Sequence, residues 1–250
     1  MNAEVFRAIR SAINEERPAA FATVVEGNLI GNYVALIHPD TVVGSLGSPA
    51  LDEAALADLR VTLVDGSARA LELEGQRVYI EAQLPPPHLV IVGAVHTAIP
   101  LIGYATILGY RTTVIDARGT FATEERFPHV DRMIEAWPDE GLAQVALHPG
   151  VAAVVLAHDP KFEDPAMEVL LKSDVGYIGA IGSRATSNER LERLAGMGFS
   201  PADLERIHGP VGLNLGGKSP EEIALSIIAE VIAVRNGKDP KLASAPAKAA

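Results

Sequence analysis

The chain has 250 residues, 48% hydrophobic and 21% charged, which is enough apolar material for a sizeable core in one or two domains. Its formal net charge of −11 repels phosphodiester backbones, so we expect no nucleic-acid partner. The absence of cysteine excludes disulfides, thiolate metal sites and a cysteine nucleophile.

Residues 1–84 predict a small α+β domain. Residues 2–15 place Val5, Ile9 and Ala12 on one helical face, and Pro18 ends that helix. A second helix is expected over 52–59. Short β-type runs predict strands at 21–25, 33–37, 41–43, 61–64, 68–73 and 77–84.

Residues 88–237 predict a Rossmann-like doubly wound parallel sheet. Apolar runs at 88–92, 112–115, 151–157 and 175–181 indicate strands buried on both faces, alternating with helices. One helix is expected over 97–108, and two later ones begin at the Ser-Pro pairs of Ser200 and Ser219. The three prolines at 85–87 separate the domains, and 238–250 predicts a flexible tail.

The turn after the first strand of this second domain is a candidate phosphate-binding turn. Gly93 permits a tight turn where the strand ends and the helix begins, and Asp116 ends the next strand, where a Rossmann carboxylate normally accepts from ribose hydroxyls. Val95 replaces the usual second glycine, and its branched side chain should crowd a dinucleotide. The alternative is a Rossmann turn that binds nothing. His96 either faces the cleft or caps the helix.

Three other elements follow strands and therefore fall at the same carboxyl edge of the sheet. His158 and Asp159 can contact a ligand or move a proton, or Asp159 can simply cap the next helix.

Gly182 and Ser183 offer donors, and Arg184 offers a fork for phosphate or carboxylate. In the alternative interpretation, Ser183 is only an N-cap and Arg184 is solvated. Arg118 either pairs with Asp116 or reaches a ligand phosphate. No residue spacing predicts a metal centre.

Taken together in chain order, these motifs resemble the C-terminal Rossmann domain of the XdhC/CoxI family. The run covers about 88–237 and includes Gly-Ala-Ile-Gly-Ser-Arg at 179–184 and His-Gly-Pro-Val-Gly-Leu at 208–213. The matching segments are 91–96, 114–118, 125–128, 157–159, 177–184, 198–200, 207–213 and 219–224. The chain departs from the family at Val95 and at Ala50, which falls where the family has a cysteine.

The resemblance implies an accessory role. Family members bind molybdenum cofactor, a phosphorylated pterin that often carries a nucleotide, and pass it to apoenzymes of molybdenum hydroxylases such as xanthine dehydrogenase or CO dehydrogenase. The family also commonly forms homodimers. With neither a signal peptide nor a bilayer-spanning apolar stretch, we expect a cytoplasmic protein without membrane contact.

Two other functions stay open. An NAD-dependent oxidoreductase would use Asp116 to favour NAD over NADP and His158 as proton donor. A non-catalytic Rossmann scaffold would only dock partner proteins.

Overall fold

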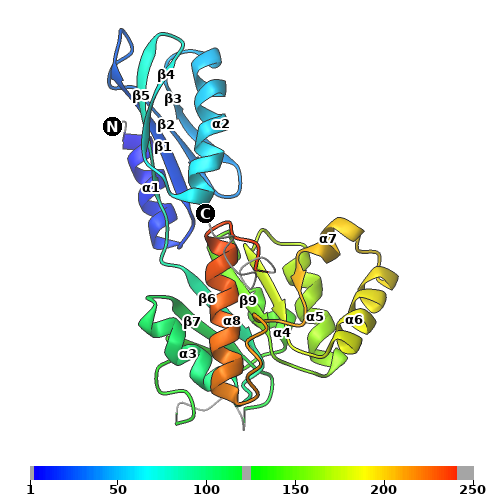
Figure 1. Ribbon diagram of the computed structural model, residues 1–250. Coiled ribbons are helices and arrows are strands. Elements are labelled where there is room, and N and C mark those ends of the chain that lie inside the picture. Colours follow the sequence, from blue (N-terminus) through cyan, green and yellow to red (C-terminus); the bar gives the residue numbers. More distant parts are fainter. Residues whose placement is uncertain (1–2, 120–124, 241–250) are drawn as a thin grey trace, which may run out of the picture. The chain divides into compact units, whose positions relative to one another are not determined.

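The computed structural model describes residues 3–119 and 125–240, so most of the tail predicted over 238–250 lies outside the described residues. The chain forms two compact units that divide between Pro85 and Pro86 (Figure 1). The division falls within the run of three prolines, where consecutive proline rings favour an extended spacer. Among the described residues, no helix combines the length and apolarity that a bilayer crossing requires.

The first unit is an antiparallel sheet with a helix on each face. Its strand order is β3-β2-β1-β5-β4. Side chains alternate along β2, so Val34 and Leu36 pack in one cluster with α2, whereas Ala35 packs in another with Val5 of α1. The elements are α1 (Ala3–Asn14), β1 (Ala19–Glu26), β2 (Tyr33–Ile37), β3 (Thr41–Ser45), α2 (Pro49–Asp65), β4 (Arg69–Leu73) and β5 (Gln76–Gln83).

The strand predicted over 61–64 is wrong, because these residues form the last turns of α2. The predicted helix over 52–59 is accordingly too short. Ser48 caps the helix, accepting from the Leu51 amide, and left-handed Gly66 ends it. Leu51, Ala55 and Leu59 are buried at a four-residue spacing that continues to Leu63. Helical burial therefore overrides the β-propensity of a short valine- and threonine-containing run.

The second unit is a six-stranded parallel sheet in the order β11-β10-β9-β6-β7-β8. From β6 the chain winds outward through β7 and β8, then returns to the other side of β6 with β9, β10 and β11. This is the Rossmann strand order, and it places the topological switch point between β6 and β9. The predicted fold class is confirmed. The elements are β6 (His88–Val92), α3 (Ala98–Ile107), β7 (Arg111–Ile115), β8 (Arg132–Ile134), α4 (Pro138–Leu142), β9 (Val151–Val155), α5 (Pro160–Leu171), β10 (Tyr177–Ala180), α6 (Arg184–Gly196), α7 (Pro201–Glu205), β11 (Ile207–His208) and α8 (Pro220–Arg235).

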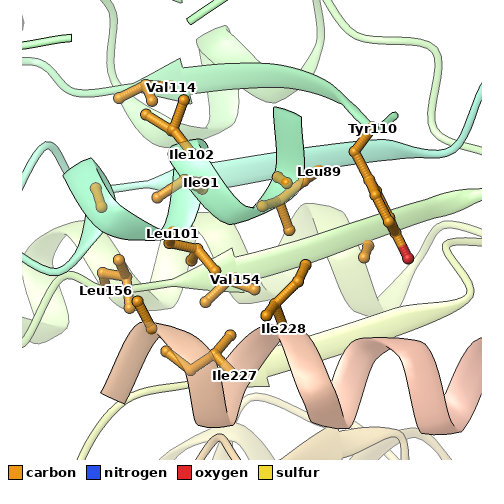
Figure 2. Close-up of a cluster of buried hydrophobic side chains, with 14 of the residues drawn as sticks. Leu89, Ile91, Leu101, Ile102, Tyr110, Val114, Val154, Leu156, Ile227 and Ile228 are labelled. Carbon is orange, nitrogen blue, oxygen red and sulfur yellow. The ribbon is translucent and has the colours of Figure 1, made fainter. Parts of the chain in front are cut away.

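Each face of this sheet has its own apolar core. Leu89 and Ile91 of β6 join the cluster beneath α3 and α8, while Val90 and Val92 join the cluster beneath α4, α5 and α6. Figure 2 shows the first cluster, where the isoleucines of α8 point toward the sheet. The predicted caps of α7 and α8 are confirmed, since Ser200 and Ser219 each form a capping box.

Candidate functional site

The candidate site lies at the carboxyl edge of the parallel sheet. Sheet hydrogen bonding continues beyond the strand ends into four of the loops there. Gly93 donates to the Ile115 carbonyl at 2.8 Å and Leu156 to Val92 at 2.8 Å. On the other side, the Ile181 amide donates to Val155 at 3.0 Å and the Val211 amide to Ala180 at 3.0 Å. The neighbouring strands therefore fix the first residue of the loops after β6, β9 and β10, and the third residue of the loop after β11.

Gly93 brings the loops after β6 and β9 into backbone contact at the switch point. Its φ of +110° is a conformation that side-chain-bearing residues rarely adopt. A Cβ at this position would lie 3.0 Å from the Ala157 nitrogen and 3.3 Å from the Leu156 carbonyl carbon. The glycine is required both by its dihedral angle and by the space available.

Asp116 connects the turn at Gly93 to the loop after β7 by hydrogen bonds. Its carboxylate is buried and accepts the Ala94 amide at 2.7 Å, the Arg118 amide at 2.9 Å and two bonds from the Arg118 guanidinium at 2.9 and 2.8 Å. Burial alone would raise the pKa of Asp116, but the hydrogen bonds from Arg118 and Ala94 outweigh it and lower that pKa. Asp116 is therefore an anion whose charge Arg118 neutralises.

The hydrogen bonds to Asp116 compete with the ribose contact predicted for this carboxylate. Two carboxylate oxygens offer about four lone-pair positions, and the four bonds from Ala94 and Arg118 use them all. A ribose hydroxyl would have to displace one of these donors. The structure adopts the first of the two alternatives for Arg118, the ion pair with Asp116.

Val95 and His96 continue the turn into α3. The Val95 side chain is half-buried and packs against the apolar cluster beneath α3 and α8, so part of it is directed into the core. His96 is exposed. Thr97, the N-cap residue, has a helical backbone and makes no side-chain capping bond. The first turn of α3 thus carries no side-chain cap of its own.

His158 and Asp159 lie on the surface directly after β9. Asp159 is the N-cap of α5 and accepts the Lys161 amide at 3.0 Å, which is the capping role weighed for it from the sequence. His158 is exposed. Their predicted ligand contacts stay predictions.

The Gly182-Ser183-Arg184 turn opens α6 on the far side of β9. Gly182 has a φ of +147°, and Ser183 is the N-cap that accepts the Thr186 amide at 3.1 Å. Arg184 is exposed, and within residues 3–119 and 125–240 no hydrogen bond or ion pair engages its guanidinium. The turn thus offers a cation to an anionic group while its hydroxyl caps the helix.

A buried ion pair beneath that turn was not foreseen from the sequence. Arg190 of α6 and Glu163 of α5 are 1% and 2% exposed, and Arg190 Nε lies 2.5 Å from Glu163 Oε1. Arg190 also donates to the Ile181 carbonyl at 2.6 Å, just before Gly182. One guanidinium therefore connects the first turn of α5 to the loop after β10. The signal in the sequence was weak, because the pair is 27 residues apart.

A second polar cluster fixes the loop after β11. Glu230 of α8 accepts the Tyr177 hydroxyl at 2.5 Å and the Gly212 amide at 2.8 Å. His208 stacks on Tyr177 with ring centres 4.6 Å apart and places Nδ1 3.7 Å from Glu230. Burial alone would raise the pKa of Glu230, but the nearby His208 side chain and the hydrogen bonds from Tyr177 and Gly212 lower it.

The second unit is similar to a known protein family. The family model described as the XdhC Rossmann domain matches residues 89–231. A probable xanthine dehydrogenase subunit of Bacillus subtilis is 33% identical over 158 residues, covering 63% of this chain and 46% of that protein. The molybdenum cofactor insertion chaperone PaoD of Escherichia coli is 28% identical over 121 residues, covering 48% of this chain and 37% of that protein.

A solved structure shares the fold over nearly the whole chain. The crystal structure of a xanthine dehydrogenase from Bacillus halodurans aligns with a TM-score of 0.62 and 22% identity, covering 98% of this chain and 69% of that one. The chain spans less than half the length of the curated relatives it matches.

Proposed function

The chain belongs to the XdhC Rossmann-domain family, and from that premise we propose that it binds molybdenum cofactor as cargo and assists its insertion into a molybdenum hydroxylase. Two relatives support this proposal by their names, one a molybdenum cofactor insertion chaperone and the other a probable xanthine dehydrogenase subunit. The partner we propose is the apoenzyme of a xanthine-dehydrogenase-like or CO-dehydrogenase-like hydroxylase. We further propose that the protein acts in the cytoplasm as a homodimer.

The observation that carries the proposal is the switch point between β6 and β9. Ligands of open parallel sheets bind outside the carboxyl ends of the strands at such a point. Gly93 keeps side chains out of it, and the first turn of α3, which no side chain caps, follows closely. Helix N-termini attract anions such as a phosphate. These features suit the phosphate of a pterin cofactor.

Arg184 supplies the second contact that the proposal needs. Its exposed guanidinium follows β10, which is hydrogen-bonded to β9, so it lies at the same edge of the sheet. A forked guanidinium suits a phosphate or carboxylate. We propose that the turn of Gly93 and the turn of Gly182 both contact the cargo, with His158 between them.

An NAD-dependent oxidoreductase is the second candidate, because the strand order is that of dinucleotide-binding domains. The occupied carboxylate of Asp116 counts against it. Ribose hydroxyls could bind there only by displacing the Arg118 side chain or the Ala94 amide.

Calorimetric titration of the purified chain with molybdenum cofactor, with NAD as comparator, tests the proposal. We expect the cofactor to bind, and Arg184→Ala to weaken binding roughly tenfold or more, the scale of a lost charge-assisted hydrogen bond. Arg60→Ala, which removes an exposed arginine of the first unit, is the control and should leave binding unchanged. Binding of NAD alone would favour the oxidoreductase, and binding of neither would overturn both functions.

A further inference from the structure

A stacked pair of aromatic rings, with cationic side chains near both rings, lies among the loops at the carboxyl edge of the parallel sheet. Trp137 and Phe162 stack with ring centres 5.1 Å apart and planes 24° apart. Lys161 Nζ lies 4.9 Å from the centre of the Trp137 ring and 5.6 Å from that of Phe162. The Arg118 guanidinium lies 5.6 Å from the Phe162 ring centre. We refer to Trp137, Phe162 and Lys161 as the aromatic shelf.

The shelf is built by two loops that leave the same edge of the sheet, and Arg118 reaches it from a third. Trp137 follows β8 as the N-cap residue of α4, while Lys161 and Phe162 follow β9 in the first turn of α5. Arg118 follows β7 and is paired with Asp116, which in turn accepts the Ala94 amide of the turn at Gly93. An unbroken series of contacts therefore runs from the turn at the switch point to the shelf.

The shelf combines a fixed ring with a ring that is open to a ligand. Phe162 is packed against the core beneath α4 and α5, which holds the stack in place. Trp137 nevertheless keeps 38% of its surface exposed. Within residues 3–119 and 125–240, no carboxylate pairs with the Lys161 ammonium. A flat aromatic ligand that carries negative charge would match both the exposed ring and the cation.

We propose that the aromatic shelf binds the base of a nucleotide whose phosphate faces the turn at Gly93. Every nucleobase presents a π-face, and bases stack readily on tryptophan and phenylalanine. The ammonium of Lys161 contributes attraction to the same phosphate-bearing ligand. The proposal rests on the proposed function only for the identity of the cargo: a molybdenum cofactor that carries a nucleotide would place its base on this shelf.

Trp137 is the only tryptophan of the chain, so its fluorescence reports directly on the shelf. The full chain is titrated with AMP, CMP and GMP, with ribose 5-phosphate as the probe that lacks a base, and binding is followed by calorimetry and by tryptophan emission. We expect the three nucleotides to bind and quench the emission, and ribose 5-phosphate to do neither. Nucleotides that bind no better than ribose 5-phosphate, or that leave the emission unchanged, would overturn the proposal.

Single substitutions distinguish the stacking of the base from the other contacts of the nucleotide. Trp137→Leu should weaken nucleotide binding about tenfold, the scale of one lost base–aromatic stack. Lys161→Gln, a milder change, should weaken binding and keep the tryptophan signal. Phe6→Leu is the matched control, because Phe6 is an exposed ring with the Arg10 guanidinium 5.9 Å from its centre in the first unit. Equal affinity in Trp137→Leu and the unaltered chain, with both folded by circular dichroism, would overturn the proposal.

Titration with molybdenum cofactor on the same preparation keeps the two proposals apart. If the cofactor binds while the nucleotides neither bind nor quench, the shelf proposal fails and the proposed function stands. If the nucleotides bind and quench while the cofactor does not bind, the shelf proposal stands and the proposed function fails.

Discussion

Removing the buried guanidinium of Arg190 should destabilise the second unit more than the loss of any other single polar contact described above. In Arg190→Met, Glu163 keeps only the bond from Arg193 at 3.1 Å, and the Ile181 carbonyl loses its 2.6 Å donor. Breaking a buried ion pair by removing one partner costs about 3–5 kcal/mol. For a chain of this length that corresponds to a fall in Tm of roughly 6–20 °C.

The assay is equilibrium unfolding in urea and on heating, followed by Trp137 emission because the only tryptophan lies in the second unit. Arg193→Met is the matched control. Arg193 touches the same carboxylate of Glu163 and also Asp164, but it is 32% exposed. Solvent screening should limit its loss to about 1 kcal/mol or less.

A double variant, Glu163→Met with Arg190→Met, completes the comparison. Removing both charges leaves no unpaired ion in the interior, so the double variant should be more stable than Arg190→Met alone. A loss of less than about 1 kcal/mol in Arg190→Met would refute the reasoning. So would a double variant that is less stable than the single one.

Three further changes test other parts of the unit. Gly93→Ala should lower the unfolding free energy by more than about 1 kcal/mol and weaken cofactor binding in calorimetry, since its Cβ would press on the Ala157 backbone. Ser219→Ala should cost about 1 kcal/mol in urea unfolding by removing the cap of α8. Tyr177→Phe should reduce the loss of stability on acidification, measured as urea midpoints from pH 7 to pH 3. The folded pKa of Glu230 is lowered partly by Tyr177, so its contribution is present above the ordinary value of 4.5 and is lost as the pH falls through the folded value.

Each of these three predictions would be contradicted by a different result. Unchanged stability in Gly93→Ala would mean that the loop after β9 yields to the added methyl group. An unchanged urea midpoint in Ser219→Ala would mean that the cap adds nothing to a helix already held by its buried face. Identical acid profiles with and without the Tyr177 hydroxyl would show that the Glu230 charge is stabilised by its other partners.

The elements predicted best are those whose signals are local. The strand at 88–92 and the capped starts of α7 and α8 depend on apolar runs and on Ser-Pro pairs, which the sequence displays directly. The edge strands β8 and β11 escaped prediction because three and two residues are too few for a periodic pattern. The error at 61–64 arose because a β-branched run is also compatible with the buried face of a longer helix.

Around the candidate site, the sequence indicated the backbone turns better than the side-chain contacts. Gly93 and Gly182 follow from the strand-to-helix spacing, and both have the positive φ that such turns require. The pairing of Asp116 with Arg118 was one of two predicted alternatives, but its bond from the Ala94 amide, 22 residues earlier in the chain, could not be predicted. The buried pair of Arg190 and Glu163 depends on the packing of two helices, which no spacing within either helix reveals.

The continuation of the sheet ladder into the loops has a consequence for hydrogen exchange. The amides of Gly93, Leu156, Ile181 and Val211 are bonded to neighbouring strands, so their exchange measures opening of the sheet whether or not a ligand is present. A footprint of the cargo should therefore begin one or more residues beyond them. Slow exchange at these four positions is an internal standard against which protection of the rest of each loop can be read.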